Sequence, residues 1–175
     1  MLLISRCVLF CLFLSLFALS CAHQPRQRDD VSRLLDSFAA TSDEDERTEI
    51  VLELYKMDDP RIVAVFRANL SRDASRLHYF IAQYLAKRGE EKALAILNEN
   101  YFEYPVSSQQ WAYSVHAFGQ YRYTPAIPNL IKSLQAASLN VVDEAVWSLR
   151  QIFPGSPESF GTPEEAVAYF TGRSA

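Results

Sequence analysis

Apolar residues recur at intervals of three and four along the chain from Val31 onward, and no stretch alternates between apolar and polar residues with a period of two. The first spacing places apolar side chains on one face of an α-helix, whereas a period of two is typical of a half-buried strand. The pattern therefore predicts an all-α fold. We expect helices over residues 31–39, 43–56, 60–70, 73–87, 90–99, 108–120, 125–136, 140–152 and 163–171.

Helix start and stop signals divide this pattern. A capping residue followed by proline occurs three times, at Asp59-Pro60, Thr124-Pro125 and Thr162-Pro163. Asp73 is expected to cap the helix over 73–87, and Gly89 to end it, because glycine readily adopts the left-handed conformation of helix C-termini. Ser107 or Ser108 should begin the helix over 108–120.

The helical pattern also repeats along the chain. Residues 85–97 (LAKRGEEKALAIL) align with residues 118–130 (FGQYRYTPAIPNL), and Leu54 and Leu149 align with the large apolar residue that begins each segment. Each unit contains a helix that ends in a large apolar residue, a short polar turn, and a second helix. A single helix pair cannot bury its apolar face, so such units are expected to stack on one another.

Three segments resemble the HEAT-like repeat, in the short bacterial form that phycobilisome-lyase-type proteins also contain: residues 117–121 (AFGQY), 126–130 (AIPNL) and 145–149 (AVWSL). The resemblance covers roughly residues 43–171 and departs from the repeat at 100–106, a longer connection. It implies a short right-handed α-solenoid of about four helix pairs with a C-terminal capping helix. It also implies that the second helices of the pairs line a concave side.

The first 30 residues differ from the rest. Residues 7–20 carry no charge, a length that suits a signal-peptide core better than a membrane span. Residues 17–21 (FALSC) resemble a lipobox, which implies a signal peptide over 1–20, a diacylglyceryl group on Cys21, a tether over 21–30 and a folded domain over 31–171. Ala22 resembles the outer-membrane sorting class, which implies a lipoprotein of the outer membrane facing the periplasm. An uncleaved signal anchor is the alternative.

Composition limits the classes of partner and the cysteine chemistry that we expect of the folded domain. Removal of residues 1–20 would leave 155 residues, enough for one domain, and would shift the net charge from −4 to −5 with the loss of Arg6. Nucleic acid and anionic membranes reward clustered Lys and Arg, so neither is an expected partner of the folded domain. Cys21 would be the only remaining cysteine, and its lipid would leave no thiol or disulfide chemistry.

Motifs for catalysis and metal binding are missing from the sequence. His23, His78 and His116 have no HxxxH or HExxH spacing, and no GxSxG, P-loop or GxGxxG segment occurs. The adjacent acidic pairs Asp58-Asp59 and Asp143-Glu144 do not converge, because neighbouring residues on a helix point about 100° apart. We therefore expect no catalytic residues, no metal and no cofactor.

The candidate partner-binding residues form three stripes on aligned helices, at spacings of three and seven. They are Phe80, Gln83 and Lys87; Tyr113, His116 and Gln120; and Glu144, Trp147 and Gln151. Flanking positions are expected in the core: Ala82, Leu85, Val115, Phe118, Val146 and Leu149. If the helices stack, the stripes join into one groove whose aromatic and hydrogen-bonding groups are those that binding surfaces favour. The alternative is that Phe80 and Trp147 belong to the core.

A second group of aromatic residues lies within 101–123, and we expect much of it to pack the longer connection against the third unit. Any part left exposed would be a contact surface. Taken together, these patterns favour a membrane-anchored, non-enzymatic interaction module of the bacterial envelope, which binds an envelope protein or peptide on its concave face. The alternatives are an enzyme accessory of the lyase-like HEAT type and a purely structural envelope lipoprotein.

Overall fold

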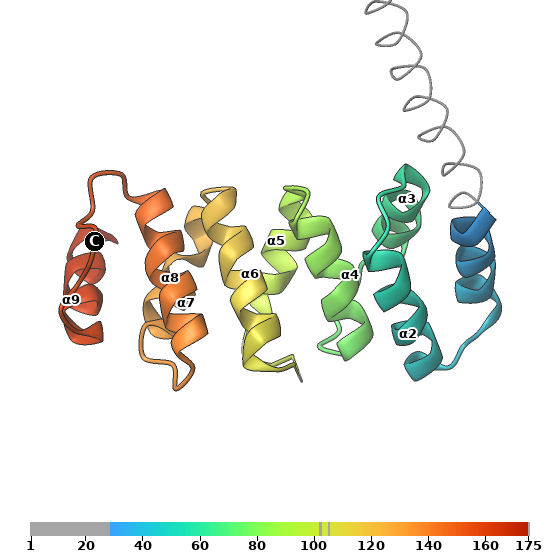
Figure 1. The fold of residues 1–175 in the computed structure, drawn as a ribbon, viewed down its shortest axis with the longest axis horizontal. Helices are drawn as coiled ribbons and strands as arrows, with labels where there is room; N and C mark the ends of the chain where they lie inside the picture. Colours follow the sequence, from blue (N-terminus) through green and yellow to red (C-terminus); the bar gives the residue numbers. More distant parts are fainter. Residues whose placement is uncertain (1–28, 102, 105, 175) are drawn as a thin grey trace, which may run out of the picture. The chain divides into compact units, whose positions relative to one another are not determined.

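The computed structural model describes residues 29–101, 103–104 and 106–174 (Figure 1). All regular secondary structure in this part of the chain is helical, which confirms the predicted all-α class. The signal peptide predicted over 1–20, the lipidation site Cys21 and nearly all of the tether lie outside the described residues. No helix in the described ranges combines the length and the apolar character that crossing a bilayer requires.

Each predicted helix has a counterpart. Residues 29–40 are helical. The helices that follow are α2 (Glu44–Tyr55), α3 (Pro60–Ala68), α4 (Arg76–Ala86), α5 (Glu91–Glu99), α6 (Ser108–Gln120), the 3₁₀ turn η1 (Thr124–Ala126), α7 (Ile127–Ser133), α8 (Leu139–Ile152) and α9 (Pro163–Ser174). The largest departures are the late start of α4 and the replacement of the single helix over 125–136 by η1 and a short α7.

The capping predictions are partly confirmed. Ser107 caps α6 through a capping box with Gln110, and Thr162 Oγ1 accepts the amide of Glu165 at 3.2 Å at the start of α9. Asp73 is not the cap of α4: Ser75 takes that place, and its Oγ accepts the amide of His78 at 3.4 Å. Residues 71–74 have no regular secondary structure and Ser75 lies in a bend, so Asp73 stands outside the first turn of α4.

Thr124 is not a helix cap either. It belongs to η1, whose N-terminal neighbour makes no side-chain capping bond. The tight 3₁₀ turn precedes α7, which carries Pro128 in its first turn. Proline is tolerated there because the first amides of a helix have no intrahelical acceptor. At Asp59-Pro60 the prediction is confirmed, since Asp59 Oδ1 accepts the amide of Arg61 at 2.9 Å.

The chain divides into two compact units, residues 1–62 and 63–175. In the described part of the first unit, the helix over 29–40, α2 and the start of α3 bury Val31, Phe38, Val51, Leu54 and Ile62. The guanidinium of Arg47 lies 4.1 Å from the ring centre of Phe38. Asp43 caps α2 by accepting the amide of Glu46 at 2.8 Å.

In the second unit each helix packs on the next helix or on the next but one along the chain (Figure 1). α4 contacts α5 and α6, α6 contacts α8 along its length, and α7 and α9 contact α8. The large apolar residues that the repeat aligns here, Leu85, Phe118 and Leu149, are all fully buried. Each of them packs the apolar face of its helix into the core, as the alignment predicts.

Hydrogen bonds between residues 31 to 35 positions apart in the sequence recur in this unit. Asn129 Nδ2 donates to the carbonyl oxygen and to Oδ1 of Asn98, both at 2.9 Å. Ser148 Oγ donates to the carbonyl of Val115 at 2.7 Å, and Tyr79 and Ser114 bond through their hydroxyls at 2.9 Å. These pairs lie 31 to 35 residues apart, close to the repeat length.

The ends of α4 and α6 share one geometry. Gly89 has φ +76°, and the amides of Gly89 and Glu90 donate to Ala86 and Leu85. Arg122, the aligned residue, has φ +48°, and the amides of Arg122 and Tyr123 donate to Gly119 and Phe118. Both are Schellman motifs, and the second has the usual apolar contact, with the rings of Phe118 and Tyr123 at 5.9 Å.

The aromatic residues of 101–123 pack largely as predicted. Tyr101 and Tyr104 are each 4 % exposed, and the ring centres of Tyr101 and Trp111 are 4.5 Å apart. Tyr104 in turn meets Tyr79 edge-on at 5.2 Å. The connection after α5 is thus held against α4 and α6 by aromatic contacts. Among the described members of the group, Tyr113 and Tyr121 remain exposed.

Candidate functional site

The contact between α6 and α8 is unusually close at one point. A Cβ atom added to Gly119 would lie 2.5 Å from both Cα and Oγ of Ser148, so a hydrogen atom is all that fits there. Ser148 is itself fully buried and donates its hydroxyl to the carbonyl of Val115 at 2.7 Å. Because the two backbones approach so closely, the side chains of α6 and α8 that flank this contact lie opposite one another.

Beside this contact, His116 of α6 is held by two residues of α8. Its imidazole lies flat on the indole of Trp147, with ring centres 4.2 Å apart and an interplanar angle of 4°. Its Nδ1 is 2.9 Å from Oε2 of Glu144, one turn before Trp147. An ionised carboxylate only accepts hydrogen bonds, so Nδ1 carries the proton and Nε2 is the ring's other polar atom.

This contact orients the imidazole more than it stabilises the fold. The side chains of His116 and Glu144 are 45 % and 37 % exposed. Ion pairs with that much solvent access contribute at most about 1 kcal/mol. The stacking and the hydrogen bond to Glu144 nevertheless restrict the ring to one orientation at the surface, so a partner would find it already ordered.

The surrounding positions complete a surface that we call the α6–α8 face: Tyr113, His116, Gln120, Glu144, Trp147 and Gln151. Tyr113 is 53 % exposed and Gln120 is exposed, while Glu144, Trp147 and Gln151 are half-buried. Just beyond it, Asn140 Nδ2 donates to Oε1 of Gln109 at 3.2 Å. Two of the three predicted stripes therefore lie together on one accessible surface.

The first predicted stripe does not join this surface. Phe80 is 4 % exposed and Gln83 is 2 % exposed, and the Gln83 amide donates to the hydroxyl of Tyr79 at 3.1 Å. Only Lys87 is exposed, and its carbonyl accepts the hydroxyl of Tyr121 at 2.7 Å. Phe80 and Gln83 are thus corrected from groove to core.

The reason lies in the composition of α4. Nine of its eleven residues are buried. A helix that is apolar on nearly all sides is typically enclosed by its neighbours, and the segment RLHYFIAQYLA has that composition. Five of the six positions that the sequence predicts in the core are buried: Ala82, Leu85, Val115, Phe118 and Leu149. The sixth, Val146, is only half-buried.

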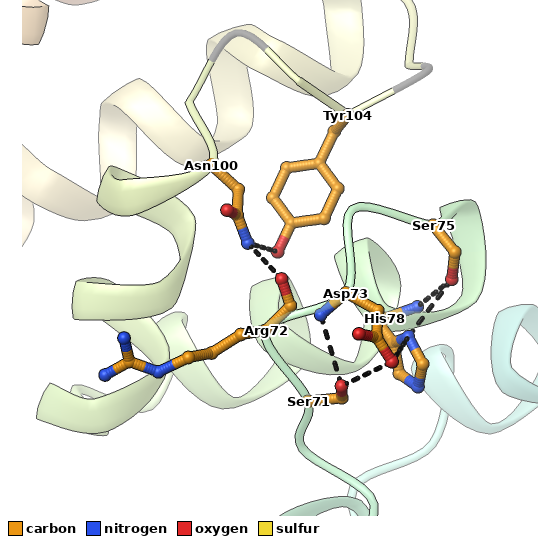
Figure 2. A network of polar contacts seen from close by, with 7 residues as sticks. All are labelled: Ser71, Arg72, Asp73, Ser75, His78, Asn100 and Tyr104. Atoms are coloured by element: carbon orange, nitrogen blue, oxygen red, sulfur yellow. Dashed lines mark hydrogen bonds and ion pairs between the residues drawn. The ribbon is translucent and has the colours of Figure 1, made fainter.

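A serine, a histidine and an aspartate lie close together at the start of α4 (Figure 2), but they do not form a catalytic triad. Ser75 Oγ lies 3.1 Å and Asp73 Oδ2 lies 3.8 Å from the same nitrogen, Nδ1 of His78. A triad needs the nucleophile and the carboxylate on opposite ring nitrogens. Ser75 also accepts the amide of His78 as the helix cap, and Asp73 accepts the hydroxyl of Ser71 at 2.8 Å.

The rest of that network joins two loops. Asn100 Nδ2 donates to the carbonyl of Arg72 at 2.7 Å and to the hydroxyl of Tyr104 at 3.3 Å (Figure 2). The segment before α4 is thereby fixed to the connection after α5. The network satisfies backbone and side-chain groups of these loops, which is a structural role.

Metal chemistry has no donor set in the part of the chain that the structure describes: no three His, Cys, Asp or Glu side chains there are grouped to hold a metal ion. No family model, no curated protein and no solved structure matches the chain. Function must therefore be argued from the geometry of the α6–α8 face.

Proposed function

We propose that this protein is a membrane-anchored, non-enzymatic interaction module of the bacterial envelope. In this proposal the helices form a short right-handed solenoid of HEAT-like pairs, with α9 as its C-terminal cap. Two features of the second unit support stacked repeats: the hydrogen bonds between residues 31 to 35 apart, and the Schellman motifs at Gly89 and Arg122.

The observation that carries the binding role is the stacked pair of His116 and Trp147. Binding surfaces favour aromatic residues because they provide a large contact area with few rotatable bonds. Here the imidazole is already fixed by Glu144 and lies at the surface, next to a tyrosine with more than half of its area exposed. Little side-chain freedom would be lost on association, which favours affinity.

The chemistry of the face indicates a peptide-like partner. Gln120 and Gln151 can each donate and accept, as a peptide backbone requires, and Tyr113 and Trp147 offer flat apolar surfaces for a side chain. The face has one carboxylate, Glu144, and no Lys or Arg. We therefore expect an extended segment of an envelope protein rather than an anionic polymer or a lipid headgroup.

We expect a photo-crosslinking amino acid at position 113, in intact cells, to give one discrete adduct with an envelope protein. Trp147→Ala should reduce that adduct at least tenfold, because the platform under His116 is lost, while helix content and Tm stay close to wild type. The same crosslinker at Lys92, an exposed position on α5, is the matched control and should not give the adduct. An adduct that survives Trp147→Ala would contradict the binding role and would favour a purely structural lipoprotein.

The anchor is tested separately. Cys21→Ser should abolish metabolic labelling with a fatty-acid analogue and should release the protein from the outer-membrane fraction, because Cys21 is the cysteine of the segment that resembles a lipobox. Cys11→Ser, within the predicted signal core, is the control substitution and should leave the labelling and the membrane fractionation unchanged. A Cys21→Ser protein that still sediments with membranes at the same apparent size would indicate an uncleaved signal anchor instead.

A further inference from the structure

A groove with a volume of about 400 Å³ lies between α8, the segment 158–162 and the start of α9, and we call it the α8–α9 groove. All of its lining residues belong to the second unit. Trp147 lines this groove and also stacks on the imidazole of His116 in the α6–α8 face. The groove therefore continues the α6–α8 face and shares one side chain with it.

The wall that α8 contributes is a second apolar face of that helix. One face is buried in the core and consists of Val141, Ala145 and Leu149. The other lines the groove and consists of Leu139, Val142 and Val146, at spacings of three and four. Leu139 is 77 % exposed, and the two valines are half-buried. A surface helix needs one apolar face for the core, so a second, accessible one that lines a groove indicates a contact surface.

The opposite wall of the groove is held in place by the protein itself. The ring of Phe160 packs against two aromatic rings of α9, with centres 5.4 Å away in each case. The amide of Gly161 donates to Oε2 of Glu165 at 2.8 Å, and Nη1 of Arg150 on α8 donates to the carbonyl of Glu158 at 3.1 Å. Because these contacts need no ligand, the groove is formed before a partner arrives and little order has to be gained on binding.

The charged residues of the groove give it a negative balance. Two carboxylates, Asp143 and Glu158, and one guanidinium, Arg150, line it. Asp143 is exposed and lies one turn before Trp147, and no hydrogen bond or ion pair joins its carboxylate to another described residue. Arg150 is seven residues further along α8, which is about 10 Å along the helix axis. A cation that binds near Trp147 would therefore meet the carboxylate of Asp143 before it meets the guanidinium.

We infer that the α8–α9 groove binds the side chain of a leucine or phenylalanine in an extended peptide segment, and that Asp143 binds a lysine or arginine within two positions of it. The inference rests on the proposed function, because the segment is the one that the α6–α8 face would bind, and it specifies the chemistry of that partner. Extended peptides are recognised by pockets for individual side chains, and complementary charge sets their register.

The test begins with a selection that assumes no partner. Random dodecapeptides displayed on phage are selected on the purified full chain in lipid nanodiscs, after removal of phage that bind empty nanodiscs. We expect one enriched pattern, in which a leucine or phenylalanine lies within two positions of a lysine or arginine. The same selection on Trp147→Ala should not enrich this pattern, since Trp147 belongs to both surfaces.

A double-mutant cycle then assigns the two contacts. It uses a synthetic copy of the enriched peptide and a second copy in which glutamine replaces the basic residue. Asp143→Asn should weaken the basic peptide about fivefold and leave the glutamine peptide within twofold, whereas Leu139→Ser should weaken both about threefold. Glu91→Gln, which removes an exposed carboxylate of α5, is the matched control and should change neither affinity. Asp143 and Leu139 are exposed, so their variants are not expected to unfold the protein.

Three results would overturn the inference: a selection that does not enrich the apolar and basic pair, equal effects of Asp143→Asn on both peptides, or unchanged binding in Leu139→Ser. The adduct at position 113 decides the proposed function separately. An adduct that requires Trp147 but persists undiminished in Leu139→Ser and in Asp143→Asn would overturn the role of the groove alone, whereas an adduct that survives Trp147→Ala would overturn the proposed function itself.

Discussion

Gly119→Ala is expected to lower the free energy of unfolding by about 3 kcal/mol, although the same change usually stabilises a helix. The new Cβ would lie 2.5 Å from Cα and Oγ of Ser148, and a backbone atom cannot move aside as the end of a flexible side chain can. Either α6 and α8 separate or both helices distort. Separation would also lengthen the buried bond from Ser148 Oγ to the carbonyl of Val115.

Gly172→Ala is the matched control for this prediction. Gly172 lies in the last helix, and a Cβ added there would meet no atom within 4 Å. The substitution should leave stability unchanged or raise it by up to about 1 kcal/mol. Urea unfolding followed by circular dichroism gives both values. A loss below about 1 kcal/mol for Gly119→Ala would show that α6 and α8 are too far apart for a Cβ at Gly119 to clash with Ser148.

Gly119→Ala should also affect the α6–α8 face, because the contact at Gly119 brings His116 and Trp147 into register. The two rings belong to different helices and stack at 4.2 Å. A small separation of the helices would open this gap while each side chain stays chemically intact. The stability of the core and the order of the binding surface are therefore linked through one glycine.

Much of the fold could be predicted from the sequence because helices leave local signals. Apolar spacing located each helix in the part of the chain that the structure describes, and Gly89 and Ser107 marked an end and a start through bonds made within a few residues. The errors at Asp73 and Thr124 have a common origin. Both residues are good caps in isolation, but neighbouring residues compete for the same turn, and the local pattern does not rank them.

The candidate site was harder to predict because it depends on which faces meet. The aligned positions correctly paired His116 with Trp147, yet the alignment contains no information on the 4° stacking or on the bond to Glu144. It also treated Phe80 as equivalent to Tyr113, although α4 is enclosed and α6 is not. Equivalence in a repeat fixes direction relative to the helix axis, whereas exposure depends on how many neighbours surround that helix.

The second large effect is expected at alkaline pH, where titration of the Tyr101 hydroxyl should lower the free energy of unfolding. Burial raises the pKa of its hydroxyl to about 12, against an ordinary value near 10, and the hydrogen bond to Ser133 offsets only part of this rise. Between these two pH values the unfolded chain releases the proton while the folded protein retains it. The stabilisation is therefore complete below about pH 10 and is lost as the pH rises toward 12, by about 2–3 kcal/mol.

Tyr101→Phe tests this directly. At pH 8 the variant should lose about 1 kcal/mol, because the hydroxyl of Ser133 no longer has its buried partner. Between pH 10 and pH 12, however, its unfolding free energy should fall by about 2–3 kcal/mol less than that of the wild type. Burial also raises the pKa values of Tyr104 and Tyr123, so some alkaline destabilisation should remain in the variant.

Tyr113→Phe is the control, because that side chain is 53 % exposed and its replacement should leave the wild-type alkaline decline in place. Urea unfolding at a series of pH values, with phenolate absorbance near 295 nm on the folded protein, separates the two variants. Parallel declines for Tyr101→Phe and wild type would mean that the Tyr101 hydroxyl reaches water when the protein is folded. In that case the aromatic contact between Tyr101 and Trp111 would also be more accessible to water than the 4 % exposure of Tyr101 indicates, so the same titration tests how tightly the connection after α5 packs.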